Sequence, residues 1–114
     1  VIAECVKRQV PVFPGAMSPT EIHLASQLGG TLVKVFPSDQ LWPAYIKSLK
    51  APFPNLRLMP TGGVTVETLT AYKRAGAEAF GVGSPLFDQR QIAAGNWDWV
   101  TQQARRFAEA YAAA

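Results

Sequence analysis

Short apolar runs alternate with longer segments of mixed polarity along the 114-residue chain. The apolar runs favour strands and cover Val10–Pro14, Leu32–Phe36, Arg57–Thr61 and Ala79–Val82. Between and after them, apolar positions recur with helical spacing over Pro19–Leu28, Leu41–Leu49, Thr65–Ala75 and Trp97–Ala112. The pattern predicts four successive strand–helix units, preceded by a helix at the start of the chain that runs into the first strand.

Strands that alternate with helices of this length pair in parallel through right-handed crossovers. The strand runs are continuously apolar, which is typical of strands covered on both faces. The predicted fold class is therefore α/β, and both a (β/α)₈ barrel and an open doubly wound sheet fit the pattern. A complete barrel needs about 200 residues, so a barrel here would be part of one. No linker divides residues 1–114, and we expect a single domain.

Composition and charge narrow the function classes. Hydrophobic residues make up 48% of the chain and charged residues 17%, as in a globular domain with a core. No run approaches the roughly 20 apolar residues that cross a bilayer, and no leader is visible, so we expect a cytoplasmic protein without a membrane partner. The chain starts without Met inside a predicted helix, so we expect the natural N-terminus to lie upstream. A net charge of +3, with basic pairs near helix ends, suits an anionic small substrate rather than nucleic acid.

One lysine interrupts an apolar run. Lys34 lies inside the run Leu-Val-Lys-Val-Phe-Pro, near the C-terminal end of a strand expected to be buried on both faces. Burial disfavours a charged ammonium group, and a neutral amine can attack a keto group to form a carbinolamine and then an imine. Lys34 is therefore a candidate Schiff-base residue. The alternatives are a lysine that reaches solvent from the strand end and a lysine that pairs with a carboxylate.

Two glycine-containing turns follow the last two predicted strands. The turn at Pro60–Val64 leads to a helix that Thr65 can cap, with Glu67 in its first turn. The run Gly81-Val-Gly83-Ser84-Pro85 repeats this pattern, with Ser84 as the cap and Pro85 at the first helical position. Glycines let backbone N–H groups approach an anion at a helix N-terminus, and barrels build a phosphate site after their last strands. Together the turns predict an anion site, although each alone also fits a purely structural turn.

A third turn follows the first predicted strand. Ser18 can cap the next helix, Pro19 suits its first position, and Glu21 can complete a capping box. We expect the backbone of Gly15, just before this helix, to lie on the same face as Lys34 and to touch the substrate.

These motifs occur in one order: Pro-Val-Phe-Pro-Gly with Ser18-Pro-Thr-Glu21, then Lys34-Val-Phe-Pro, then Pro60-Thr-Gly-Gly-Val, then Gly83-Ser84. Their order and spacing resemble those of the 2-keto-3-deoxy-6-phosphogluconate and 4-hydroxy-2-oxoglutarate aldolases over essentially the whole chain. The resemblance implies a TIM (β/α)₈ barrel, of which this chain forms the last four βα units and lacks the N-terminal half. It also implies that Lys34, on strand six, forms a Schiff base with pyruvate.

The resemblance further implies the reaction and its site. The implied enzyme is a class I aldolase of the Entner-Doudoroff pathway that cleaves 2-keto-3-deoxy-6-phosphogluconate to pyruvate and glyceraldehyde 3-phosphate. Cleavage of 4-hydroxy-2-oxoglutarate to pyruvate and glyoxylate is an implied second activity. No metal or organic cofactor is implied, and the implied assembly is a homotrimer. The implied substrate-binding residues are Pro14, Gly15, Phe36, Pro37, Thr61, Gly62 and Gly63, and the implied phosphate-binding residues are Gly62, Gly63, Gly83 and Ser84.

The sequence departs from the family in one respect. The general acid/base glutamate and the carboxylate-binding arginine of such aldolases come from early strands that this sequence lacks. Asp39, in the loop beyond Lys34, is the one carboxylate expected nearby, and we interpret it as a solvated loop residue. The alternatives are a phosphate-binding isomerase or synthase with an electrostatic Lys34, a half-barrel without turnover, and a 2-keto-3-deoxy-6-phosphogalactonate aldolase. Thr61 favours the phosphogluconate branch, since the phosphogalactonate branch tends to carry an apolar residue there.

Overall fold

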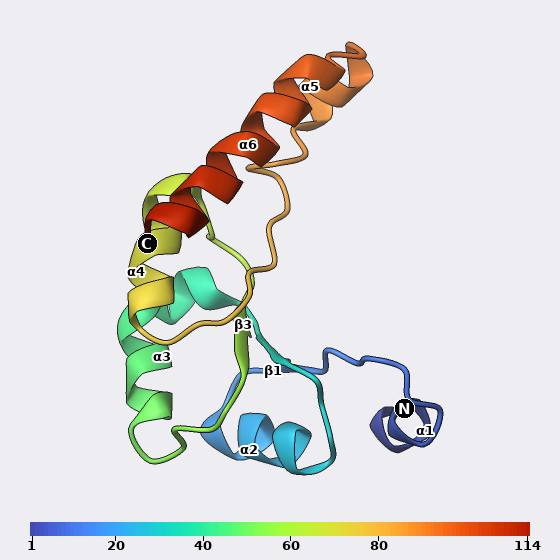
Figure 1. Cartoon of the computed structure of the whole chain (residues 1–114), viewed down its shortest axis with the longest axis vertical. Helices are drawn as coiled ribbons and strands as arrows, with labels where there is room; N and C mark the ends of the chain where they lie inside the picture. Colours follow the sequence, from blue (N-terminus) through green and yellow to red (C-terminus); the bar gives the residue numbers. More distant parts are fainter.

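A computed structural model describes residues 1–114 as an α/β fold with a parallel sheet (Figure 1). The strands pair in the order β1-β2-β3, and both pairs are parallel. The predicted α/β class and parallel pairing are therefore confirmed. The elements are α1 (Ile2–Lys7), β1 (Gly15–Ala16), α2 (Pro19–Gln27), β2 (Val33–Val35), a 3₁₀ turn η1 (Ser38–Gln40), α3 (Trp42–Lys50), β3 (Leu58–Pro60), α4 (Val66–Arg74), α5 (Gln89–Ala93) and α6 (Trp97–Ala113).

The first predicted strand is wrong in its bounds. Residues Val10–Pro14 carry no strand, and β1 begins just beyond them. Pro11 and Pro14 have no N–H group, so they cannot donate to a sheet ladder. The run still lies beside the next strand, because the N–H of Lys34 donates to the carbonyl of Pro14 at 2.8 Å.

The fourth predicted strand, Ala79–Val82, is reduced to a single bridge between Gly81 and Thr61. The N–H of Gly81 donates to the carbonyl of Pro60 at 2.9 Å, so the run lies beside the end of β3. It has a neighbouring strand on one side only, and no full ladder develops.

The predicted helices are confirmed within one or two residues at their ends. Ser18 and Glu21 form the expected capping box at α2, in which the carboxylate accepts the N–H of Ser18 at 2.8 Å. Thr65 caps α4 as expected, but its reciprocal partner is Thr68, whose hydroxyl accepts the N–H of Thr65 at 2.9 Å. Local capping signals therefore determine where these helices begin.

The predicted helix start at Ser84 and Pro85 is wrong. These residues form a single turn that closes onto the carbonyl of Gly83, and the next helix, α5, begins only after Asp88. The carboxylate of Asp88 accepts two backbone N–H groups of α5, at 2.9 and 3.0 Å. The cap that the structure uses is therefore Asp88, four residues after Ser84.

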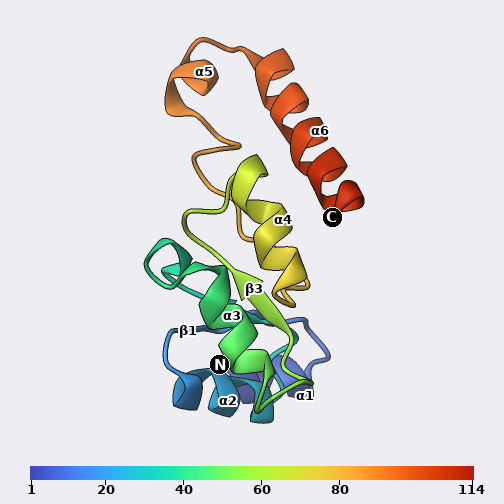
Figure 2. The ribbon, with the colours of Figure 1, turned by 90° about the vertical axis from the view of Figure 1, so that its left-hand side faces the viewer.

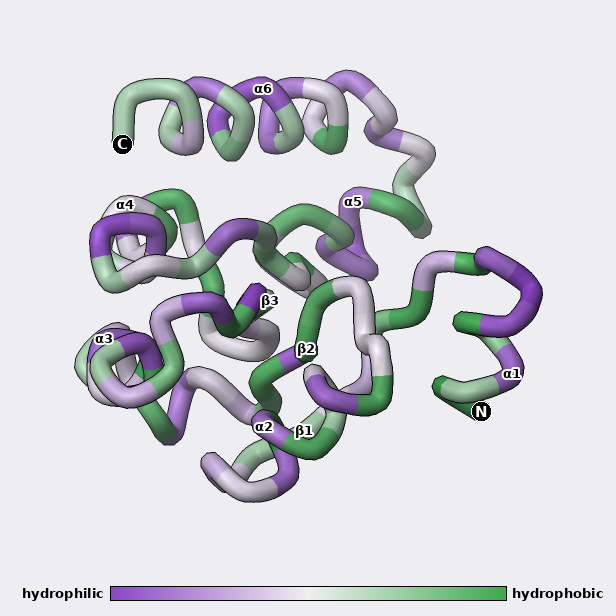
Figure 3. The backbone as a smooth tube through the Cα atoms, turned by 60° about the horizontal axis from the view of Figure 1, so that its bottom comes forward, coloured by the Kyte–Doolittle hydropathy of each residue, from purple (hydrophilic) through white to green (hydrophobic).

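The helices cover one side of the strands. In Figure 3, α2, α3, α4 and α6 follow one another around an arc outside the sheet, and Figures 1 and 2 show α6 packed against α4. The core lies between these helices and the sheet, and its fully buried side chains include Ile22, Val33, Val35, Ile46 and Leu58. Lys34 and Met59 alternate to the opposite face of the sheet and are only half-buried. Within these 114 residues the strands are therefore covered by helices on one face only.

Large apolar side chains remain exposed away from this core. Phe13, Phe36 and Phe87 are each about half exposed, and α1 buries no residue. None of the helices is both long enough and apolar enough to span a bilayer.

Candidate active site

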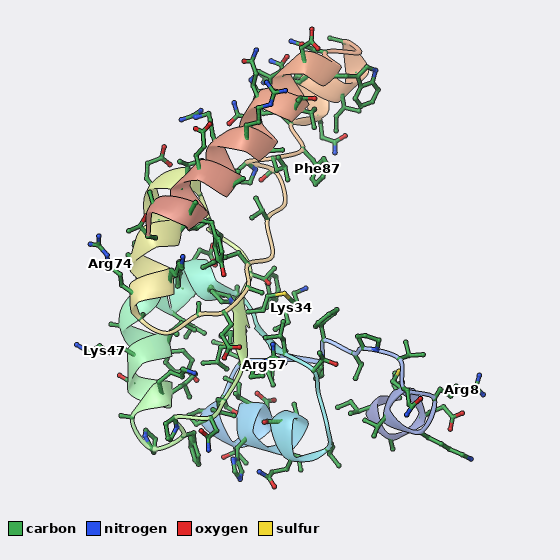
Figure 4. The ribbon with its side chains drawn as sticks, in the orientation of Figure 1. Arg8, Lys34, Lys47, Arg57, Arg74 and Phe87 are labelled. Carbon is green, nitrogen blue, oxygen red and sulfur yellow. The ribbon has the colours of Figure 1, made fainter.

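Lys34 is the central residue of β2 and projects to the face of the sheet that the helices leave open. Its strand neighbours are Gly15 on β1 and Met59 on β3. Figure 4 shows Lys34 at the middle of the molecule, whereas Lys47 and Arg74 point outward from α3 and α4. The sheet therefore separates this amine from the surface cations.

The amine of Lys34 has an aromatic neighbour and no anionic one. Its Nζ lies 5.0 Å from the centroid of the Phe36 ring, within range of a cation–π interaction. None of the salt bridges or side-chain hydrogen bonds of the chain involves Lys34. Within these 114 residues Lys34 therefore pairs with no carboxylate.

The two predicted glycine turns line one cavity of about 200 Å³ beside Phe36. The cavity thus brings together segments about twenty residues apart in sequence at the ends of adjacent strands. Its lining residues are Phe36, Thr61, Gly62, Gly63, Val64, Gly81, Gly83, Ser84 and Pro85. Six of the ten predicted site residues belong to this lining, and Lys34 adjoins it through Phe36.

Backbone donors in this cavity are unused within the chain. The N–H groups of Gly63, Val64, Gly83 and Ser84 donate no hydrogen bond to any other group of the protein, whereas that of Gly62 faces the carbonyl of Gly81 in the bridge between Thr61 and Gly81. Successive free amides at a turn before a helix form an anion-binding concavity. The arrangement can therefore bind a phosphate or a carboxylate.

The first glycine turn needs glycine for two reasons. Gly62 and Gly63 have φ of +89° and +69°, in the left-handed region that favours glycine. A Cβ on Gly63 would lie 2.9 Å from the Cα of Asp39, so the turn also packs closely on η1. Asp39 is exposed and forms no ion pair, as expected for a solvated loop residue.

Three further predicted residues surround Lys34 but do not line the cavity. Pro14 accepts the backbone N–H of Lys34, Gly15 is paired with it across the sheet, and Pro37 follows Phe36 through a cis peptide bond. No group of three or more His, Cys, Asp or Glu side chains is placed to hold a metal ion.

Two buried polar residues beside the site were not predicted. Ser38 is 1% exposed and links the ends of β2 and β3, and Tyr72 of α4 donates its hydroxyl to the Ser38 carbonyl at 2.7 Å. Ser38 reads as a loop serine after an apolar run, and Tyr72 falls on the core face of a helix. Neither position carries a sequence signal for the contact between them.

Comparisons with known proteins agree on one family. A family model described as KDPG and KHG aldolase matches residues 1–103. The 2-dehydro-3-deoxy-6-phosphogalactonate aldolase of Escherichia coli (strain K12) is 37% identical over 112 residues, 97% of this chain and 53% of that protein. The 2-dehydro-3-deoxy-phosphogluconate aldolase of Treponema pallidum (strain Nichols) is 35% identical over 89% of this chain and 49% of that protein.

A solved structure described as native KDPGal superposes with a TM-score of 0.87 at 36% identity. The match covers 97% of this chain and 52% of that one. The chain therefore spans about half the length of the relatives that it matches.

Proposed function

The chain belongs to the KDPG and KHG aldolase family, and from this premise we propose that Lys34 is the Schiff-base residue of a class I aldolase. The proposed reaction cleaves 2-keto-3-deoxy-6-phosphogluconate to pyruvate and glyceraldehyde 3-phosphate, with 4-hydroxy-2-oxoglutarate as a second substrate. The observation that carries the proposal is an unpaired amine on the open face of the sheet, beside a cavity lined with free backbone amides.

The proposed chemistry begins when the neutral amine of Lys34 adds to the C2 keto carbon. The carbinolamine loses water to give an iminium, which accepts the electron pair of the C3–C4 bond as that bond breaks. The C4 hydroxyl loses its proton, glyceraldehyde 3-phosphate departs, and an enamine remains on Nζ. Protonation at C3 and hydrolysis then release pyruvate and restore the amine.

A general acid/base must move these protons. Asp39 packs against Gly63 and forms no ion pair with Lys34. We therefore assign this role to a residue outside the 114 described here.

The free amides of the two glycine turns support the proposed phosphate site. We assign the substrate phosphate to Gly62, Gly63, Gly83 and Ser84. The keto acid end would then lie toward Lys34, among Pro14, Gly15, Phe36, Pro37 and Thr61.

We also propose that residues 1–114 are the last four units of a (β/α)₈ barrel and form a single domain within it. The arc of helices on one side of the sheet and the half-exposed residues on the other support this arrangement.

A homotrimer, a cytoplasmic location and a role in the Entner-Doudoroff pathway complete the proposal. It predicts that this chain alone cleaves substrate very slowly even if imine formation survives, since general acid/base catalysis contributes about 10²- to 10⁴-fold. Near-equal turnover by this chain and the full-length protein would contradict it.

Borohydride trapping tests the covalent step in the full-length protein. Pyruvate and borohydride should add a stable mass to the peptide that contains Lys34, and Lys34→Ala should abolish the addition. Lys47→Ala is the matched control, because Lys47 is an exposed lysine on α3. Labelling at another residue, or none, would remove the aldolase assignment and favour an isomerase or synthase with an electrostatic lysine.

A phosphogalactonate substrate is the second candidate, since a relative that is 37% identical carries that name. Thr61 favours the phosphogluconate substrate instead: it lines the cavity, and its hydroxyl donates to the Met59 carbonyl at 3.3 Å. Thr61→Val should shift the ratio of kcat/KM for the two C4 epimers toward the phosphogalactonate. An unchanged ratio would show that Thr61 does not select the epimer.

A further inference from the structure

Ser38 uses all of its polar atoms to join the two strands that carry the proposed site. Its hydroxyl donates to the carbonyl of Val35, one residue beyond Lys34 on β2, at 2.7 Å. The same oxygen accepts the N–H of Thr61 at 3.1 Å, and the N–H of Ser38 donates to the carbonyl of Thr61 at 2.9 Å. The side chain therefore connects the end of the Lys34 strand to the first residue of the glycine turn.

A second contact, between Tyr72 and Ser38, connects α4 to the same residues. Tyr72, 2% exposed on α4, donates its hydroxyl to the Ser38 carbonyl at 2.7 Å. The helix that carries Tyr72 begins directly after the glycine turn. Burial, with a smaller contribution from the Asp39 carboxylate, raises the pKa of Tyr72 and keeps its hydroxyl protonated as a donor. The turn is thus held from β2 on one side and from α4 on the other.

We propose that Ser38 is a positioning residue, held by Tyr72, that sets the distance between Lys34 and the anion-binding turn at Thr61–Gly63. The inference rests on the proposed aldolase function. Pyruvate has no phosphate and forms its imine without contact with the turn, whereas a phosphorylated keto acid must reach the amine and the turn at once. A displacement of about 1 Å can cost on the order of 10²-fold in rate when two groups must act together.

Loss of the hydroxyl should not unfold the protein. The N–H of Thr61 also donates to the carbonyl of Val35 at 2.9 Å, so the two strands remain paired without the serine oxygen. The expected result of Ser38→Ala is therefore a looser turn in a folded protein.

The test compares two readouts in the full-length protein. For Ser38→Ala, pyruvate trapping by borohydride should stay within about twofold of wild type, while kcat/KM for the phosphorylated keto acid should fall by about 10- to 100-fold. Tyr72→Phe should give a smaller change in the same direction, and Ser38→Thr, which keeps the hydroxyl, should restore activity toward wild type. Ser48→Ala is the control, because it removes an exposed serine hydroxyl that bonds only within α3.

Three outcomes would overturn the inference. Equal losses of trapping and turnover would show a purely structural role, and unchanged turnover in Ser38→Ala would show that the hydroxyl does not position the turn. If Ser38→Ala does not fold, Tyr72→Phe becomes the test. Wild-type turnover in that variant would then contradict the role of the Tyr72–Ser38 contact in positioning the turn. Absence of pyruvate trapping in the wild-type protein would instead reject the proposed function, so the two failures are distinguishable.

Discussion

Of the two glycine turns that line the cavity, the one after β3 is held on several sides and the one after the Gly81 bridge is not. Gly63 has a positive φ, and a Cβ there would meet the backbone of Asp39. Gly83 has neither feature, since nothing lies within 4 Å of where its Cβ would be. In the first turn, the backbone conformation and the close packing at Gly63 therefore require glycine. At Gly83 no contact within the chain requires glycine, whereas a Cβ on Gly81, which also lines the cavity, would lie 2.9 Å from the Cβ of Thr61.

The segments beyond the two turns differ in the same way. The first turn enters α4, which has nine residues, a threonine cap and an acidic residue in its first turn. The second enters a single turn, and the five-residue α5 starts later and has no acidic residue in its first turn. Only the first turn therefore has the N-terminal dipole of a substantial helix beside it. The comparison predicts that changes in the first turn affect folding, and changes in the second affect mainly ligand binding.

Gly63→Ala should have the largest effect on stability. A non-glycine residue in the left-handed region costs about 1–3 kcal/mol, and the close approach of Asp39 adds to that cost. Urea unfolding of the full-length protein measures the loss. Gly95→Ala is the matched control, because Gly95 has a φ of +67° but no atom within 4 Å of a Cβ. Equal losses in the two variants would show that the contact with Asp39 adds nothing.

Gly83→Ala should leave stability within about 0.5 kcal/mol, because it creates neither strain nor a clash. The added methyl group would enter the space where an anion approaches the backbone amides. The KM of the phosphorylated substrate should therefore rise by about tenfold, which corresponds to about 1.4 kcal/mol, while pyruvate trapping stays unchanged. A large loss of stability with unchanged KM would reverse the comparison between the turns.

A smaller difference in stability is expected between Thr65 and Ser84, the two residues predicted from the sequence to cap a helix after each turn. Thr65→Ala should cost about 1 kcal/mol, because it removes the side-chain acceptor at the start of α4. Ser84→Ala should change stability by less than about 0.5 kcal/mol, since Ser84 caps no helix. Thermal unfolding of both variants measures the difference, and equal costs would indicate that Ser84 supports its turn after all.

The smallest expected effect is a pH dependence at the start of α4. A hydrogen bond with the Thr65 hydroxyl, helped by the backbone N–H of Glu67 and the charge of Arg106, holds the pKa of Glu67 below its ordinary value of 4.5. A carboxyl group whose pKa is lowered by folding stabilises the protein above its unfolded value, and this contribution is lost as pH falls through the folded value. Glu67→Gln should therefore flatten the decline of stability below about pH 4.5. Glu109→Gln, at an exposed position on α6, is the control, and identical profiles for the two variants would contradict the expectation.

Much of the fold followed from local signals. The capping box at Ser18 and the cap at Thr65 act within three residues, so both helix starts were predictable from the sequence. Strand bounds were less predictable, because a ladder depends on the partner strand as well as on the run itself. The prolines before β1 and the single neighbour of Gly81 shortened two of the predicted strands. After Ser84 the helix starts four residues later than predicted, with Asp88 as its cap.

For the candidate site, the sequence by itself determined Lys34 and the two glycine turns, because an amine in an apolar run and glycines at strand ends are local features. Tertiary structure decided that both turns share one cavity and that the lysine has no anionic partner. It also decided the bond between Ser38 and Tyr72, which are 34 residues apart. Such a contact depends on how β2, β3 and α4 pack together. The sequence does not indicate which hydroxyl and which carbonyl will become hydrogen-bond partners, because packing decides this.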